Sequence, residues 1–222
     1  GNGGNGPFWT IQNKVNVSGN AITPECAALI AKGKGRAPKI LSPSDLGGAK
    51  ALPGEPLYPE DEAKARGNAL HLLLERLPLA DPSAWDTLTT ALIPDSPLAA
   101  ALLVEARAVL DALPDHFTAE TLAEVAVTGL WNGQQMLGSI DRLLVRPDRV
   151  LVIDYKSNSV IPRTPAEVPE GILRQMGAYA HLLGQIYPDR RVEVAILWTR
   201  GPLLMPLDPD IVRLALSRAT IP

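Results

Sequence analysis

The chain has 222 residues, of which 46% are hydrophobic and 20% charged, and its formal net charge is −3. This length can bury the core of one large domain, and the composition is typical of a globular protein rather than a disordered one. The weakly acidic charge excludes wrapping of nucleic acid by a broadly basic protein, so DNA binding would need a local basic surface or a metal ion. Cys26 is the only cysteine, which excludes a disulfide framework, a zinc knuckle and a four-cysteine iron–sulfur cluster.

The first quarter of the chain shows no targeting signal and little hydrophobic periodicity. No apolar run is long enough to cross a bilayer, and the opening residues lack the order of a signal peptide, so we expect a cytoplasmic protein. Residues 1–58 are rich in Gly, Asn, Pro and Lys, with one short helical pattern over residues 24–32. They predict a linker-like extension ahead of a domain over residues 59–222. A basic run in this extension fits either a solvated linker or a loop that contacts phosphate, and it comprises Lys32, Lys34, Arg36 and Lys39.

Helical patterns follow the extension. Residues 59–78 begin with acidic side chains, carry leucines at helical spacing and end at Pro78, which predicts an amphipathic helix. Two further helices are predicted over residues 83–92 and 97–113, the second ending before Pro114.

The hydrophobic period then drops to two residues. Alternating segments over residues 122–130 and 135–145 flank an Asn-Gly pair, which is the strongest short signal for a β-hairpin. A turn over residues 146–149 leads to an apolar run over residues 150–155, so the three segments predict a meander. The rest of the chain predicts a helix, a buried strand and a closing helix, over residues 169–186, 192–198 and 209–219.

Two acidic residues fall opposite each other in this meander. If the turn contains no bulge, Val145 faces Val150 and Asp141 faces Asp154. Directly opposed residues have Cβ atoms roughly 4.5–5.5 Å apart, and like charges there are destabilising. A divalent cation such as Mg²⁺ or Mn²⁺ between the carboxylates would turn this repulsion into attraction.

Lys156 completes the pattern, because the period of a strand places it on the same face as Asp154. Two carboxylates, a metal and an ammonium suffice for phosphodiester hydrolysis: the metal activates water and the lysine stabilises charge or helps to deprotonate that water. An exposed Asp–Lys pair at the end of a strand is the alternative interpretation.

These motifs resemble those of a known nuclease family. The run G-S-I-D-R-L, a turn and the run V-I-D-Y-K-S are similar to the nuclease motifs of the RecB-type branch of the D…(D/E)-x-K restriction-endonuclease-like superfamily. The segment GNALHLLLE over residues 67–75 resembles the helix that carries a metal-ligating histidine, here His71. The resemblance covers residues 59–198 and implies an α/β fold, with a mixed central sheet flanked by helices.

The resemblance also implies roles for individual residues. The implied metal ligands are His71, Asp141, Asp154 and the backbone carbonyl of Tyr155, with Glu124 as an accessory ligand of metal or water. Lys156 is the implied catalytic cation, and the metal is Mg²⁺ or Mn²⁺, with no iron–sulfur cluster.

Two further features near these ligands each allow two interpretations. Gln175 and Tyr179 match the family's Q-x-x-x-Y motif, so they contact substrate phosphate or support Lys156, or else serve core packing and a helix cap. Glu75 lies one turn after His71 and fits either a partner of the histidine or a surface salt bridge.

Within the branch, the LSPSDLGGAKA run and the lack of a cysteine cluster resemble the C-terminal nuclease domain of AddA, a subunit of bacterial AddAB helicase–nucleases. No GxxxxGK[ST] loop is present, so we expect the helicase motor elsewhere in a longer chain. The resemblance implies exonucleolytic trimming of the single strands produced by unwinding, in double-strand break repair near the nucleoid, with an AddB-type partner. The alternatives are a catalytically silent module that binds DNA or a partner, and a free-standing exonuclease.

Overall fold

The computed structural model describes residues 40–55, 59–94 and 96–219. The helical pattern over residues 24–32 and the basic run from Lys32 to Lys39 lie outside the described residues. None of the helices in the described part of the chain is long and apolar enough to span a membrane.

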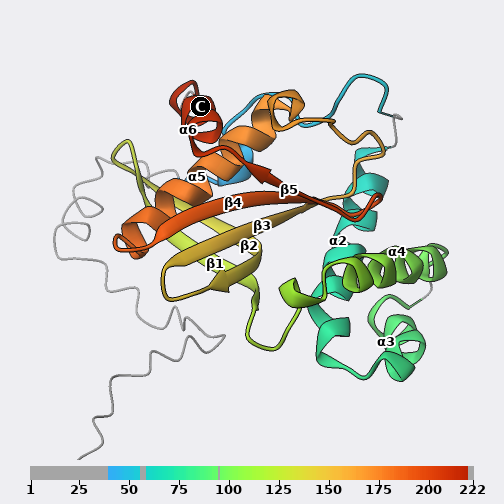
Figure 1. The fold of residues 1–222 in the computed structure, drawn as a ribbon. Helices are drawn as coiled ribbons and strands as arrows, with labels where there is room; N and C mark the ends of the chain where they lie inside the picture. The colour runs from blue at the N-terminus through green and yellow to red at the C-terminus, as the bar shows by residue number, and fades with distance from the viewer. Residues whose placement is uncertain (1–39, 56–58, 95, 220–222) are drawn as a thin grey trace, which may run out of the picture. The chain divides into compact units, whose positions relative to one another are not determined.

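A five-stranded mixed sheet forms the centre of the fold (Figure 1). Its strands lie side by side in chain order, and they are β1 (Leu122–Trp131), β2 (Gln134–Val145), β3 (Arg149–Lys156), β4 (Arg191–Trp198) and β5 (Leu203–Leu207). Strands β3 and β4 are parallel, and the other neighbouring strands are antiparallel. The predicted α/β fold with a mixed sheet is therefore confirmed.

Helices cover both faces of the sheet (Figure 1). One face packs against α5 (Glu170–Ile186) and α6 (Pro209–Ser217). The other packs against α2 (Glu60–Arg76), α3 (Trp85–Leu92) and α4 (Ala99–Ala112). Val152 and Ile153 of β3 are fully buried in opposite cores, which explains why this strand is a continuous apolar run rather than an alternating one.

The predicted hairpin and its register are present. Asn132 and Gly133 have φ values of 50° and 76°, the left-handed conformation that a two-residue hairpin turn of type I′ requires. In the next turn Val145 pairs with Val150 and Leu143 with Val152, as the sequence predicts. The paired ladder between β2 and β3 ends at the pair of Arg142 with Ile153, so Asp141 and Asp154 lie one residue beyond its end.

Part of the predicted extension lies against the sheet and α5. Leu41 accepts a backbone hydrogen bond from Leu137 and donates one to the carbonyl of Gln135, each 2.9 Å long. Further along, the amide of Gly171 at the start of α5 donates to the carbonyl of Ala49 over 2.8 Å. These segments therefore contact the sheet and α5 directly, and the domain boundary at residue 58 stays a prediction.

Candidate active site

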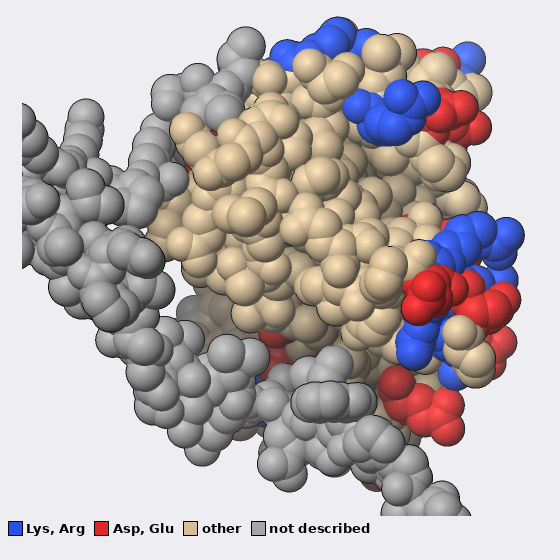
Figure 2. Space-filling model, turned by 90° about the vertical axis from the view of Figure 1, so that its left-hand side faces the viewer, with Lys and Arg blue, Asp and Glu red and all other residues tan. Residues whose placement is uncertain are grey.

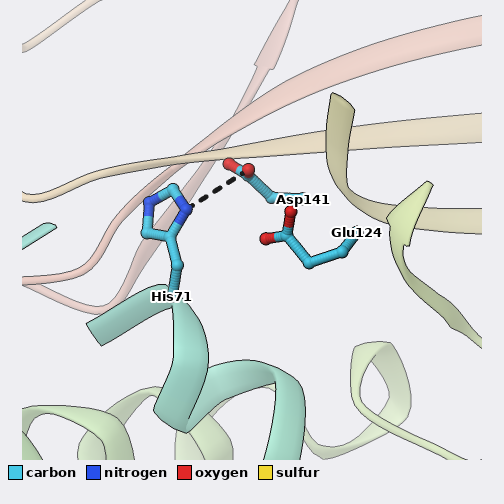
Figure 3. Close-up of side chains that lie close together, drawn as sticks. All are labelled: His71, Glu124 and Asp141. Carbon is cyan, nitrogen blue, oxygen red and sulfur yellow. Dashed lines mark ion pairs between the residues drawn. The ribbon is translucent and has the colours of Figure 1, made fainter. Parts of the chain in front are cut away.

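Three side chains from a helix and two strands converge beside the sheet. The His71 imidazole points from α2 toward Asp141 of β2 and Glu124 of β1 (Figure 3). One ligand atom from each residue lies within 4.8 Å of the other two, and Nδ1 of His71 is 3.3 Å from Oδ1 of Asp141. The second oxygen of Asp141 accepts a hydrogen bond from the backbone amide of Tyr155 over 2.6 Å. The carboxylate of Asp141 is thus fixed by β3 on one side and faces the histidine on the other.

The strands are irregular where these acids meet. Ala123 pairs with Arg142 and Val125 with Ile140, so Glu124 lies opposite Asp141 in the register of β1 and β2. Glu124 itself is left out of the pairing and has a φ of 50°, a left-handed conformation that is rare for a residue with a side chain. Strain of this kind persists only where surrounding structure enforces it, and it is frequent at functional sites.

A second group of polar side chains adjoins the first. Asp154 is 2% exposed, and its Oδ2 lies 2.5 Å from Nζ of Lys156. Gln175 of α5 binds both partners, because its Nε2 donates to Oδ1 of Asp154 over 2.9 Å and its Oε1 accepts from Lys156 over 3.3 Å. The Gln175 amide therefore holds the Asp154–Lys156 pair in one geometry.

Tyr179 links this second group to Glu124. Its hydroxyl donates to the carbonyl of Ser139 over 2.5 Å and accepts from Nε2 of Gln175 over 3.4 Å. The Ser139 hydroxyl in turn donates to Glu124 over 3.1 Å. Gly138 permits this packing, since a Cβ there would lie 3.0 Å from the ring of Tyr179.

The charges of the site favour proton uptake at every group whose pKa is shifted. Burial raises the pKa of Asp154, although the Lys156 ammonium opposes it, and burial together with Asp141 raises the pKa of Glu124. Burial alone would lower the pKa of Lys156, but the carboxylates of Asp154 and Asp141 raise it. Burial also opposes protonation of His71, yet its hydrogen bond to Asp141 and the nearby acids raise its pKa. For His71 and Lys156 it is therefore the negative charge of the neighbouring acids that raises the pKa, whereas for Asp154 and Glu124 burial is the largest cause.

A divalent cation fits this donor set. Carboxylate oxygens and an imidazole nitrogen are ligands for divalent cations, and the positive charge would offset the repulsion between the carboxylates of Glu124 and Asp141. A cation held by His71, Glu124 and Asp141 would activate water and polarise a phosphoryl oxygen. Lys156 places an ammonium beside the same position, where it can stabilise developing negative charge.

The structure places the residues that the sequence singled out in two adjoining groups. His71, Glu124 and Asp141 come together in one, and Asp154, Lys156, Gln175 and Tyr179 form the other. Metal ligation by Asp154 and by the Tyr155 carbonyl stays a prediction, as do the catalytic roles. Glu75 forms an ion pair of 3.2 Å with Arg76, which is the salt-bridge alternative.

Sequence reasoning missed one residue that supports the site. Arg142 directly follows Asp141 and is 2% exposed, and its Nη2 donates to the carbonyl of Leu74 in α2 over 2.6 Å. A charged residue inside a run of strand residues that are otherwise apolar was the available signal. Its partner could not be identified from the sequence, because Leu74 is 68 residues away.

A mixed sheet between helical layers, with acids and a lysine on β1, β2 and β3 and a histidine on α2, defines a candidate metal-dependent hydrolase. Residues 46–212 match the family model of the PD-(D/E)XK nuclease superfamily, which is three quarters of the chain. The chain therefore belongs to this superfamily, whose members use divalent metals.

Comparisons with individual proteins define the function less closely than the family model does. No curated protein matches the sequence. A crystal structure from Eubacterium rectale, described as a candidate exonuclease, aligns with a TM-score of 0.49 and 12% identity over 80% of this chain and 76% of that chain. The crystal structure of SSO0001 aligns with a TM-score of 0.30 and 17% identity over 66% of this chain and 71% of that chain. These scores are too low to define a substrate for this chain.

Proposed function

We propose that this chain is a deoxyribonuclease that requires Mg²⁺ or Mn²⁺. The observation that carries the proposal is that two groups of side chains adjoin. His71, Glu124 and Asp141 surround a candidate cation position, and the Asp154–Lys156 pair lies beside it. Asp154 adds a further oxygen donor, Lys156 stabilises charge on the scissile phosphate, and Gln175 keeps the lysine in place. A module that only bound DNA would gain nothing from this concentration of negative charge.

We further propose that it trims single strands exonucleolytically, within an AddA-type subunit of a helicase–nuclease that acts in double-strand break repair. The resemblance of its motifs supports this assignment, and the motor and an AddB-type partner would supply the unwound strand. The face shown in Figure 2 is not broadly basic. Uncharged residues predominate on it, and Lys and Arg lie among Asp and Glu toward its top and right-hand edges.

The test is cleavage of labelled single-stranded DNA with Mg²⁺, with Mn²⁺ and with a chelator. We expect Asp154→Asn and Lys156→Met each to lower the rate by at least about 100-fold, the effect of removing one stabilising group from an active site. The matched controls are Asp148→Asn and Lys64→Met, which change the same residue types at exposed positions outside the site. Both controls should cleave at the rate of the unsubstituted chain.

Substrate shape separates the finer claims. An exonuclease degrades a linear single strand and leaves a circular one intact, whereas an endonuclease cuts both. Cleavage of the circle would overturn the exonuclease assignment and keep the nuclease. If the chain binds DNA but no metal supports cleavage, and Asp154→Asn binds equally well, the catalytically silent module is the correct description.

A further inference from the structure

A cavity of about 870 Å³ opens directly beyond the catalytic lysine. Its lining includes residues 157–159, which follow Lys156 along the chain, together with parts of α2, of α4 and of the segment 51–55. Because three residues of extended chain reach only about 10 Å, this wall begins within a nucleotide or two of the candidate site. The volume is in the range of small-molecule binding sites, about 300–1,000 Å³.

The walls of the cavity combine apolar surface with a few polar groups. Leu52, Leu98 and Ala101 supply apolar area, and Asn158 supplies an amide that can both donate and accept hydrogen bonds. Two arginines and two glutamates also line the cavity, so their formal charges cancel. A lining of this kind suits a flat, polar and uncharged group better than a phosphate.

Arg66 on α2 forms part of the cavity wall, and Glu105 holds its guanidinium. Glu105 of α4 pairs with its Nη2, and the same carboxylate accepts a hydrogen bond from Thr199 over 2.6 Å, which fixes the position of the guanidinium. Nη1 of Arg66 is buried and has no hydrogen-bond partner within the described residues. Because Nη1 is buried, it lies behind the cavity surface, and Arg66 lines the cavity with the rest of its side chain.

Arg200 also lines the cavity. Its Nε donates to the carbonyl of Ser157 over 3.0 Å, which ties the guanidinium to the chain segment that leaves the catalytic lysine. Glu55 holds the next part of this segment, since its carboxylate accepts from the amides of Ser159 and Val160. The cavity wall is therefore built on the end of the strand that carries Lys156.

We propose that this cavity receives one unstacked base of a single DNA strand, next to the phosphate that is cleaved. The proposal rests on the proposed nuclease function and names the form of its substrate. A guanidinium plane stacks on any base, and the Asn158 amide can donate to and accept from base edges. A base that is paired within a duplex cannot enter unless it is first unstacked, at a cost. The cavity thus favours single strands and frayed ends.

The experiment fills the cavity and measures binding rather than cleavage. Ala101 is exposed on α4 and lines the cavity, so Ala101→Trp blocks it without entering the core. Ala108→Trp is the matched control, because Ala108 is equally exposed on the same helix and lies outside the lining. The full chain is titrated, with a chelator present, into two labelled oligonucleotides of equal length, one normal and one with abasic sites in place of bases.

We expect the unsubstituted chain and Ala108→Trp to bind the normal strand about tenfold more tightly than the abasic strand, as stacking of one base implies. Ala101→Trp should lose this preference and bind both strands equally. Retention of the preference in Ala101→Trp, or its absence from the unsubstituted chain, overturns the proposal. Because no cleavage is measured, failure here leaves the nuclease intact, and a chain that never cleaves can still show the preference.

Discussion

Arg142 is a buried cation that joins the sheet to the helix carrying His71. Its guanidinium donates to the Leu74 carbonyl over 2.6 Å, to the Tyr155 hydroxyl over 3.0 Å and to the Thr121 hydroxyl over 3.2 Å. It also lies 4.7 Å from the ring centre of Phe117. None of these partners is a carboxylate, so neutral acceptors and an aromatic ring stabilise the buried cation. If any one of these groups is lost, the buried polar groups that remain lack a partner, which costs free energy.

The same contacts orient His71. Leu74 lies three residues after His71 in α2, and the Tyr155 ring meets the imidazole edge to face, with ring centres 5.3 Å apart. Arg142 therefore fixes the helix through Leu74 and the flanking ring through Tyr155. It is a positioning residue for the candidate cation site, since its contacts reach the site only through other residues.

At this scale we predict that Arg142→Met lowers the free energy of unfolding by about 1–3 kcal/mol, because buried acceptors lose their donor. Urea denaturation measures the change, and calorimetric titration with Mn²⁺ should show weaker binding as His71 loses its support. Arg149→Met is the control, because Arg149 is exposed at the start of β3. Equal stability and equal Mn²⁺ affinity in the two variants would contradict the positioning role.

At the scale of elements, residues 41–49 pack against β2 and α5 through a very close backbone approach. Gly48 has a φ of +93°, and a Cβ at this position would lie 2.8 Å from the amide nitrogen of Gly171. The Gly171 amide is part of the first turn of α5, the helix that carries Gln175 and Tyr179. This contact therefore fixes the start of the helix that holds the Asp154–Lys156 pair.

We predict that Gly48→Ala destabilises the protein by about 1–3 kcal/mol more than Gly54→Ala, the usual cost of overpacking. Gly54 has a similar φ of +87° but nothing within 4 Å of its Cβ position, so both variants carry the backbone strain and only the first carries the clash. Chemical denaturation of the two proteins gives the difference directly. Identical midpoints and slopes would mean that the segment does not pack on α5 in solution.

The elements that the sequence predicts well are those whose signals are local. The Asn132-Gly133 turn and the short turn before Arg149 fix the register of β1, β2 and β3, which runs as far as the pair of Arg142 with Ile153, next to Asp141 and Asp154. Strand β5 has no such signal, because Pro206 interrupts a short apolar run, and proline is tolerated there since β5 pairs with β4 alone. The packing of residues 41–49 could not be predicted for a related reason. Glycines in a sequence are typical of a linker, whereas in the structure Gly48 permits a close backbone contact.

The candidate site, too, could be predicted from the sequence only in part. Spacing along β2 and β3 predicts the proximity of Asp141, Asp154 and Lys156, because the period of a strand determines it. The left-handed conformation of Glu124 and the cradle of Gln175 around Asp154 depend on how the helical layers pack on the sheet. Such contacts between distant segments have no signature in a single sequence.

At the scale of the whole domain, the site draws on both helical layers. His71 comes from the layer of α2, whereas Gln175 and Tyr179 come from α5 on the opposite face of the sheet. The complete site, with the cation donors and the Asp154–Lys156 pair in place, forms only when both layers are packed. A cation bound by the folded chain alone must therefore stabilise the whole domain, by about 2.7 kcal/mol at a concentration 100 times its dissociation constant.

The contribution of the His71–Asp141 ion pair to stability and the stabilisation by a bound metal should depend on pH in opposite directions. In the metal-free chain the folded-state pKa of His71 is raised above its usual value of 6.5. Its ion pair with Asp141 thus contributes stability that is complete below the unfolded pKa and is lost as pH rises through the folded pKa. Metal ligation needs the neutral imidazole, so the stabilisation by Mg²⁺ or Mn²⁺ must instead increase over the same range.

Thermal unfolding between about pH 5 and pH 8, with a chelator and with Mn²⁺, measures both trends. The gap between the two unfolding temperatures should widen as pH rises, and His71→Gln should remove most of this widening. His181→Gln controls for the loss of a histidine, because His181 is exposed and bonds the Leu130 carbonyl, away from the acids. If Mn²⁺ stabilises His71→Gln as strongly as the unsubstituted chain at every pH, the cation lies elsewhere and His71 is not among its ligands.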